Sequence, residues 1–135
     1  HRSRVVVPKA GGKPWVQTYT PEATTRWEEE VAQVAMEQIR AAPVSGTSDE
    51  FFLPFKGRLL ISLRFNFHKP KSYSSSVVNH VVKPDVDNLA KAVLDGLQKA
   101  RIIEDDNHVT DLSISKRYES DSHPEGVEID LTAFE

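Results

Sequence analysis

Two stretches of the chain repeat apolar residues at the spacing of an amphipathic helix. The first begins at Thr20-Pro21, where threonine can cap a helix and proline is tolerated at its first position. It is expected to continue to about Arg40, with its glutamates on a solvated face. Its apolar positions are Trp27, Val31, Val34, Ala35 and Ile39. The second predicted helix begins at Asp85 or Asp87, ends near Ala100, and has the apolar stripe Val86, Leu89, Val93 and Leu97.

Alternation of apolar and polar residues is the period of a strand with one buried face, and Arg58–Phe67 shows it most clearly. The other expected strands are 2–8, about 109–118 and about 127–134. Turns, loops or extended connections are expected at 10–14, 15–20, 43–57 and 68–80. Together these elements predict a single α+β domain, with a small mixed sheet packed against two main helices.

Composition places the chain among globular proteins of one domain, with 135 residues, 39% of them hydrophobic and 27% charged. The absence of cysteine excludes thiolate nucleophiles, zinc–cysteine sites and disulfide frameworks, and it fits a reducing compartment. No apolar run approaches the roughly 20 residues of a membrane span, and no signal-peptide pattern opens the sequence. A cytoplasmic protein without a membrane segment is therefore expected.

Charge is distributed unevenly along the chain, although the net charge is only −3. Residues 58–101 carry eight bases against three acids, whereas residues 102–135 carry two bases against ten acids. Asp85 and Asp87 are two of the three acids in the basic segment. A small acidic centre in positive surroundings suits an enzyme that cuts phosphodiesters, and solvated surface charge is the alternative interpretation.

The most distinctive motif is Lys-Pro-Asp-Val-Asp-Asn-Leu at 83–89, followed by the doublet Asp105-Asp106. Clustered carboxylates repel one another and favour a bound cation, and hard oxygen ligands suit Mg²⁺ or Mn²⁺. The motif therefore indicates a metal-dependent enzyme that acts on phosphates. A structural interpretation also exists, because Asp85 and Asp87 can cap the second helix, but it leaves the doublet unexplained.

The doublet can join the first two acids only if the chain returns, since a helix over 87–100 is roughly 20 Å long. A strand that follows Asp106 and pairs with the strand leading to Asp85 makes such a return possible. Periodicity alone does not decide whether it happens.

Two other metal-binding motifs are excluded. A calcium EF-hand counted from Asp85 needs glycine and glutamate at positions where the chain has Ala90 and Gly96. The His-Glu-x-x-His motif of zinc proteases is absent. His108 lies next to the doublet and can reach a metal there, although an exposed loop histidine is the simpler interpretation.

The stretch 83–111 resembles the signature of RusA-type Holliday-junction resolvases. Two acids, a following Asn-Leu, a lysine four residues after the second acid and a spaced doublet all match together. The resemblance implies a C₂ homodimer that uses Mg²⁺ to resolve four-way DNA junctions by paired symmetric nicks, with the metal polarising the phosphate and helping to generate hydroxide. The implied metal ligands are Asp85, Asp87 and Asp106, with Asp105 in reserve. The implied catalytic residues are Asp85, Asp87, Lys91 and Asp106.

Basic residues are expected to contact DNA phosphates, with an affinity that falls steeply with salt. They are Lys9, Lys13, Lys69, Lys71 and Lys83. The segment 68–80 has little to bury and is expected to be a mobile basic loop, with a passive linker as the alternative. For Lys91 the alternative is a helical salt bridge with Asp87 or Asp95. The apolar face of the first helix is a candidate dimer interface, although core packing explains it more simply.

Two other classes of protein share these features. One is a junction-binding protein without nuclease activity, and the other is a metal-dependent phosphohydrolase that acts on nucleotides. Metal-dependent, symmetric nicking of a four-way junction that is absent from Asp87→Asn distinguishes a resolvase from both. The expected setting is DNA recombination and repair in the cytoplasm of a bacterial or phage-infected cell.

Overall fold

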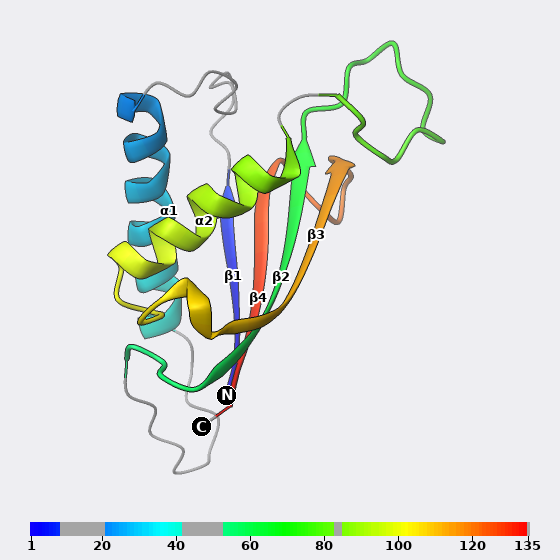
Figure 1. Cartoon of the computed structure of the whole chain (residues 1–135). Coiled ribbons are helices and arrows are strands. Elements are labelled where there is room, and N and C mark those ends of the chain that lie inside the picture. The colour runs from blue at the N-terminus through cyan, green and yellow to red at the C-terminus, as the bar shows by residue number, and fades with distance from the viewer. Residues whose placement is uncertain (9–20, 42–52, 83–84, 135) are drawn as a thin grey trace.

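The computed structural model describes residues 1–8, 21–41, 53–82 and 85–134 (Figure 1). In chain order the elements are β1 (Arg2–Pro8), α1 (Pro21–Ala41), β2 (Arg58–Phe67), α2 (Val86–Lys99), the 3₁₀ turn η1 (Asp106–His108), β3 (Val109–Tyr118) and β4 (Gly126–Phe134). Both predicted helices and the predicted strands at 2–8, 58–67, 109–118 and 127–134 are confirmed at nearly the expected bounds. The expected turn at 10–14, the extended segment at 15–20 and most of the loop at 43–57 lie outside the described residues.

The strands form one mixed sheet in the order β1-β4-β2-β3. β4 pairs antiparallel with both β1 and β2, whereas β2 and β3 are parallel. Both helices cover the same face of this sheet (Figure 1), so the predicted α+β arrangement of a small mixed sheet and two main helices is confirmed. Neither helix in the described ranges is long and apolar enough to cross a membrane.

α2 connects two strands that are parallel neighbours in the sheet. In such a unit the helix begins near the carboxyl end of the first strand, and the second strand starts again at the opposite end of the sheet. Asp85 therefore lies at the end where β2 finishes, and it interacts electrostatically with Lys116 near the end of β3. Val109 begins β3 beside Leu59, near the start of β2. The direction of β3 thus decides where the two acidic pairs lie.

The core lies between the helices and the sheet, and it contains the predicted apolar faces of both helices. They contribute Trp27, Val31, Ala35 and Ile39 from α1 and Leu89, Val93 and Leu97 from α2. This burial confirms core packing as the explanation of the apolar face of α1, which is therefore unavailable to a partner subunit. Two residues differ from the expectation. Glu28, expected on a solvated face, is buried, and Val86, expected in the apolar stripe of the second helix, is 42% exposed.

The two helices approach closely at Gly96. A Cβ atom there would lie 2.9 Å from the carbonyl oxygen of Glu28 and 2.9 Å from the Cβ of Val31, so the position requires a residue without a side chain. The Glu28 carboxylate reaches across to α2, where it lies 2.7 Å from the Nζ of Lys99. An ion pair and a close backbone contact therefore hold α2 against α1.

The other face of the sheet carries a polar network centred on Glu128 of β4, which is only 6% exposed. Its carboxylate accepts a hydrogen bond of 2.7 Å from the Asn66 side chain and pairs with Arg4 of β1. The Nδ1 of His123, in the turn before β4, lies 2.7 Å away. Burial by itself would raise the pKa of the Glu128 carboxyl, but these partners outweigh it and hold the pKa below its ordinary value. A buried charge with this many partners suits a structural role.

Candidate active site

Asp85 and Asp87 lie on either side of the first residue of α2, at the end of the sheet where β2 finishes. Asp85 occupies the N-cap position with an extended backbone, and its side chain makes no capping hydrogen bond. Both side chains are exposed. Helix capping therefore does not account for the Asp85 carboxylate, although the helix dipole favours both negative charges.

Lys116 of β3 is a neighbour of Asp85 that the sequence analysis missed. It stands opposite Phe65 in the register with β2, and its Nζ donates to the carbonyl oxygen of Val82. Burial lowers the pKa of Lys116, and the Asp85 carboxylate opposes that shift. The sequence did contain a sign that Lys116 is unusual. The inward-facing positions of this strand are otherwise apolar or aromatic, and a lysine among them suggests a special role.

Lys91 lies one turn beyond Asp87 on the exposed side of α2. Among the residues that the structure describes, it has no ion-pair partner within 4.0 Å, so the salt bridge considered with Asp87 or Asp95 is not formed. Burial, followed by the neighbouring Glu28 carboxylate, raises the pKa of Asp95, and the charge of Lys91 partly opposes this rise. The ammonium group of Lys91 thus lies near the acids of α2 without forming a close pair with one of them.

Asp105 and Asp106 lie at the other end of α2, around the turn η1. The Asp105 side chain accepts a hydrogen bond of 3.0 Å from the backbone N–H of Asn107, and this bond lowers the pKa of its carboxyl. Asp105 therefore caps the turn. The backbone N–H of Asp106 donates to the Gln98 side chain at 3.1 Å, and the Asp106 side chain is exposed. Of the two acids in the doublet, the structure thus gives a local capping role to Asp105.

The two acidic pairs do not meet within one chain. Gln98, which binds the backbone of Asp106, lies eleven residues after Asp87 on the same helix, and this separation corresponds to about 16 Å along the helix axis. No group of three described ligands within 4.8 Å of one another includes Asp85, Asp87 or Asp106. The strand after Asp106 does pair with β2, but the pairing is parallel and therefore starts at the opposite end of the sheet.

A different group of described side chains could hold a metal ion, namely His68, Glu119 and Glu125. They follow β2, follow β3 and precede β4, and their ligand atoms lie within 4.8 Å of one another. The Nδ1 of His68 is 3.3 Å from the Glu119 carboxylate. His108, the histidine next to the doublet, is not in this group, and its ring instead lies 3.3 Å from the carbonyl oxygen of residue 57.

The segment that leads from β2 to α2 is attached to β3 through residues 78–80. The backbone N–H of Tyr118 donates to the carbonyl of Val78 at 2.8 Å, and that of His80 donates to Lys116 at 3.3 Å. The buried ring of His80 stacks on Phe67 with 3.8 Å between ring centroids. Burial and the charge of Lys116 lower the pKa of His80 to about 4. The expectation that this segment has little to bury is therefore wrong at His80.

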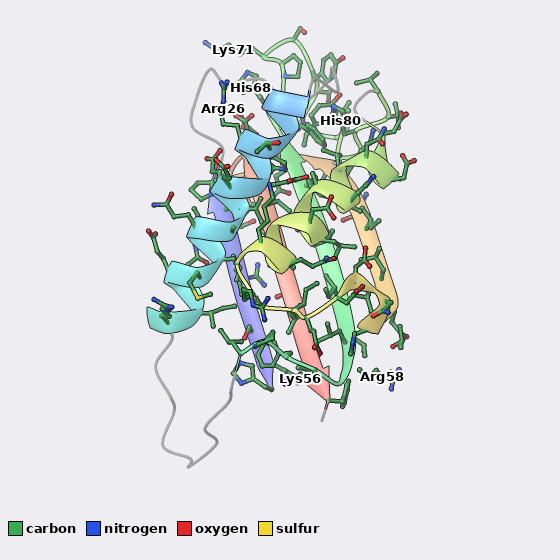
Figure 2. All side chains as sticks on the ribbon, turned by 60° about the vertical axis from the view of Figure 1, so that its left-hand side comes forward. Arg26, Lys56, Arg58, His68, Lys71 and His80 are labelled. Atoms are coloured by element: carbon green, nitrogen blue, oxygen red, sulfur yellow. The ribbon has the colours of Figure 1, made fainter. Side chains whose placement is uncertain are left out.

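Two of the lysines expected to bind DNA lie in the described part of the chain. Lys71 is exposed and Lys69 is partly exposed, both in the segment after β2. Figure 2 shows Lys71 at the same end of the molecule as His68 and His80. This is also the end where α2 begins, so positive charge lies near the first acidic pair. The remaining candidates fall outside the described residues, and they are Lys9, Lys13 and Lys83.

Comparison with known proteins identifies the family of the chain. A family model described as endodeoxyribonuclease RusA matches residues 1–132 of the chain. No curated protein gave a significant match. The matched residues include both helices, the first three strands and all but the last two residues of β4. The chain therefore belongs to the RusA family of endodeoxyribonucleases, the enzymes that resolve Holliday junctions.

Proposed function

We propose that this chain is a Mg²⁺-dependent endodeoxyribonuclease that resolves four-way junctions by paired symmetric nicks. The observation that carries the proposal is the pair Asp85 and Asp87, because both are exposed at the start of α2 and the Asp85 side chain does not cap the helix. Membership of the RusA family supports DNA as the substrate. The proposed catalytic residues are Asp85, Asp87, Lys91 and Asp106. The proposed setting is the cytoplasm of a bacterial or phage-infected cell.

The acids suit a hard divalent cation. Carboxylate oxygens are the ligands that Mg²⁺ and Mn²⁺ prefer, and two exposed carboxylates so close in the chain repel each other unless a cation neutralises them. We assign Asp85, Asp87 and Asp106 as the metal ligands. When bound, the ion supplies positive charge that stabilises the scissile phosphate as negative charge develops on it.

Basic side chains of the chain itself bind and orient the DNA in this proposal. Lys91, one turn beyond Asp87, donates to a phosphate oxygen in the transition state, where a preorganised charge is most effective. Lys116 adds positive charge beside Asp85. Phosphate contacts farther from the chemistry come from lysines that give affinity without sequence preference. These are Lys9, Lys13, Lys69, Lys71 and Lys83.

A second copy of the chain completes the proposed site. Asp106 lies at the far end of α2 from Asp85, and the parallel pairing of β2 with β3 keeps it there. In a C₂ homodimer with antiparallel α2 helices, the start of one helix faces the end of the other. Asp106 of the partner subunit then approaches Asp85 and Asp87. Two such shared sites provide the two nicks that symmetric resolution needs.

Cleavage of synthetic DNA tests the activity. The protein is incubated with a four-way junction, a linear duplex and a flap, in Mg²⁺ or in EDTA. We expect symmetric, Mg²⁺-dependent nicks in the junction that Asp87→Asn loses. Asp121→Asn, a change at an exposed aspartate between β3 and β4, serves as the matched control and retains the nicks.

Three results would contradict the proposed activity. Equal cleavage of the linear duplex, or no cleavage of any substrate, would reject a resolvase. Binding of the junction without cleavage in any metal would identify a junction-binding protein. Hydrolysis of free nucleotides without nicking would identify a phosphohydrolase.

Mixed dimers test whether the site is shared between subunits. We expect chains with Asp87→Asn alone and chains with Asp106→Asn alone to be inactive. In a dimer of one chain of each kind, a shared site leaves one complete set of acids, so one strand of the junction is nicked. Sites contained within single chains would each lack one acid, and the mixed dimer would then be inactive.

A further inference from the structure

A group of valines next to the proposed active site is exposed to solvent. Val81 is 84% exposed and Val82 is 57% exposed, and three more valines nearby in the chain are each exposed by more than a third. We call these residues the valine cluster: Val77, Val78, Val81, Val82 and Val86. Single apolar side chains on a surface are ordinary, whereas five exposed ones within ten residues make this surface a candidate interaction site.

The backbone that carries the valine cluster is held in place. Asn79 forms an antiparallel bridge with Arg117, and the buried His80 stacks on Phe67. Successive residues of an extended segment point to opposite sides, so burial of His80 turns Val81 outward. Lys116 then holds the carbonyl oxygen of the next residue, Val82. The exposure of Val81 is therefore a consequence of how the segment is attached to β3.

The valine cluster lies directly beside the proposed catalytic acids. Val82 precedes Asp85 by three residues, which limits their separation to about 10 Å of chain. Figure 1 shows the segment 68–82 projecting beyond the end of the sheet from which α2 starts. Lys71 lies on this segment, and positive charge there attracts DNA phosphates. A strand whose phosphate reaches Asp85 would therefore bring its bases over the valines.

We propose that Val81 and Val82 pack against unstacked bases at the branch point of a DNA junction and hold the crossover open for cleavage. This inference rests on the proposed function, and it assigns the source of its selectivity for branched DNA. Apolar side chains inserted at a base step replace a lost stacking neighbour. Valine suits this use because its branched side chain has few rotamers to lose. A continuous linear duplex offers no exposed base face, so the valines contribute nothing to binding it.

A second copy of the chain is the competing occupant of the valine cluster. Five partly exposed valines provide a few hundred Å² at most, well below the roughly 800 Å² per partner of a stable dimer. Lys116, which contacts Val82, would repel the same lysine of another copy across such a contact, whereas it attracts nucleic acid. These considerations favour DNA.

The double variant Val81→Thr/Val82→Thr tests the inference, because threonine keeps the branched shape and replaces a methyl group by a hydroxyl. The probe is a four-way junction with 2-aminopurine at its branch point, a base whose fluorescence rises when it unstacks, bound in EDTA to prevent cleavage. Leu112→Thr, at an exposed leucine of β3, is the matched control. We expect the wild type and the control to raise the fluorescence, and the double variant to lose most of that rise. Cleavage of the junction by the double variant should slow by about tenfold or more, with binding of linear duplex unchanged.

A junction built with unpaired bases at the crossover supplies a rescue, since cleavage by the double variant should recover on it. Wild-type fluorescence and cleavage in the double variant would overturn the inference. A fall in molecular mass of the double variant by light scattering would also overturn it and would assign the valines to a contact between copies. The proposed nuclease can fail separately: a wild-type protein that opens the branch point but never nicks rejects the nuclease and supports the role of the valines.

Discussion

The substitution Gly96→Ala tests how much the close approach of α2 to α1 contributes to the stability of the fold. Alanine is favoured over glycine within a helix by about 1 kcal/mol, so the substitution would stabilise an isolated α2. In the folded chain the new methyl group would lie 2.9 Å from the carbonyl oxygen of Glu28 and from the side chain of Val31. A backbone oxygen cannot rotate aside, so we place the overpacking cost in the upper part of the usual range of about 1–3 kcal/mol. The expected net loss in the free energy of unfolding is then about 1–2 kcal/mol.

Urea unfolding followed by the fluorescence of Trp27, which is buried in α1, provides the assay. With a denaturant slope of about 2 kcal/mol per molar, the midpoint should fall by roughly 0.5–1 M. Val31→Ala removes part of the obstructing side chain, so the double variant Gly96→Ala/Val31→Ala should lose less stability than the sum of the single changes. A Gly96→Ala protein as stable as the wild type would refute this reasoning, because helix propensity would then outweigh the close contact.

Further predictions concern three other parts of the structure, namely the Glu128 network, His80 and the acidic doublet. Glu128→Ala should lower the free energy of unfolding by about 1–3 kcal/mol because the buried Asn66 amide loses its hydrogen-bond acceptor, whereas Asp130→Ala, an exposed neighbour, should cost under about 1 kcal/mol. The folded-state pKa of Glu128 lies below its ordinary value of 4.5. The contribution of its carboxylate to the free energy of unfolding is therefore present above pH 4.5 and is lost as the pH falls through the folded-state pKa. A pH series of urea melts that compares the wild type with Glu128→Gln checks this. His80 has a folded-state pKa of about 4 against an ordinary 6.5, so the free energy of unfolding should be highest above pH 6.5 and should fall progressively between pH 6.5 and pH 4. This fall in the free energy of unfolding should be about 1–3 kcal/mol after allowance for solvent screening. It should disappear in His80→Phe, which has no titrating ring. In the doublet, Asp105→Asn should keep junction cleavage, whereas Asp106→Asn should abolish it, as a gel assay of nicked strands would show.

Local patterns are sufficient to predict the elements of this fold. The apolar residues Leu89, Val93 and Leu97 repeat at helical spacing and are buried on α2, and the alternation of Arg58–Phe67 matches β2 at both ends. The agreement is close because these periods depend only on residues that are neighbours in sequence. The acidic motif is likewise recognised from spacing alone, and the family whose signature it resembles matches nearly the whole chain.

The misassigned residues are those whose environment depends on another element. Glu28 belongs to a helix face that carries several glutamates, but it is buried because Lys99 of α2 pairs with it. Lys116 has an ordinary place in a strand pattern, and only the folded chain brings it beside Asp85. His80 lies in a segment rich in serine, and stacking on Phe67 buries it. Such contacts join residues that are distant in sequence, so no local pattern reports them.

The amino-acid sequence by itself determined the helices, the strands and the acidic residues of this protein. Only the tertiary structure decided that β3 is parallel to β2, and therefore that Asp106 lies at the opposite end of α2 from Asp85. An alternating strand pattern is the same in either direction, since each residue points to the opposite side from its neighbour whichever way the chain runs. The direction of β3 is set by the connection, because a helix that crosses the sheet returns the chain to the end of the sheet at which the first strand began.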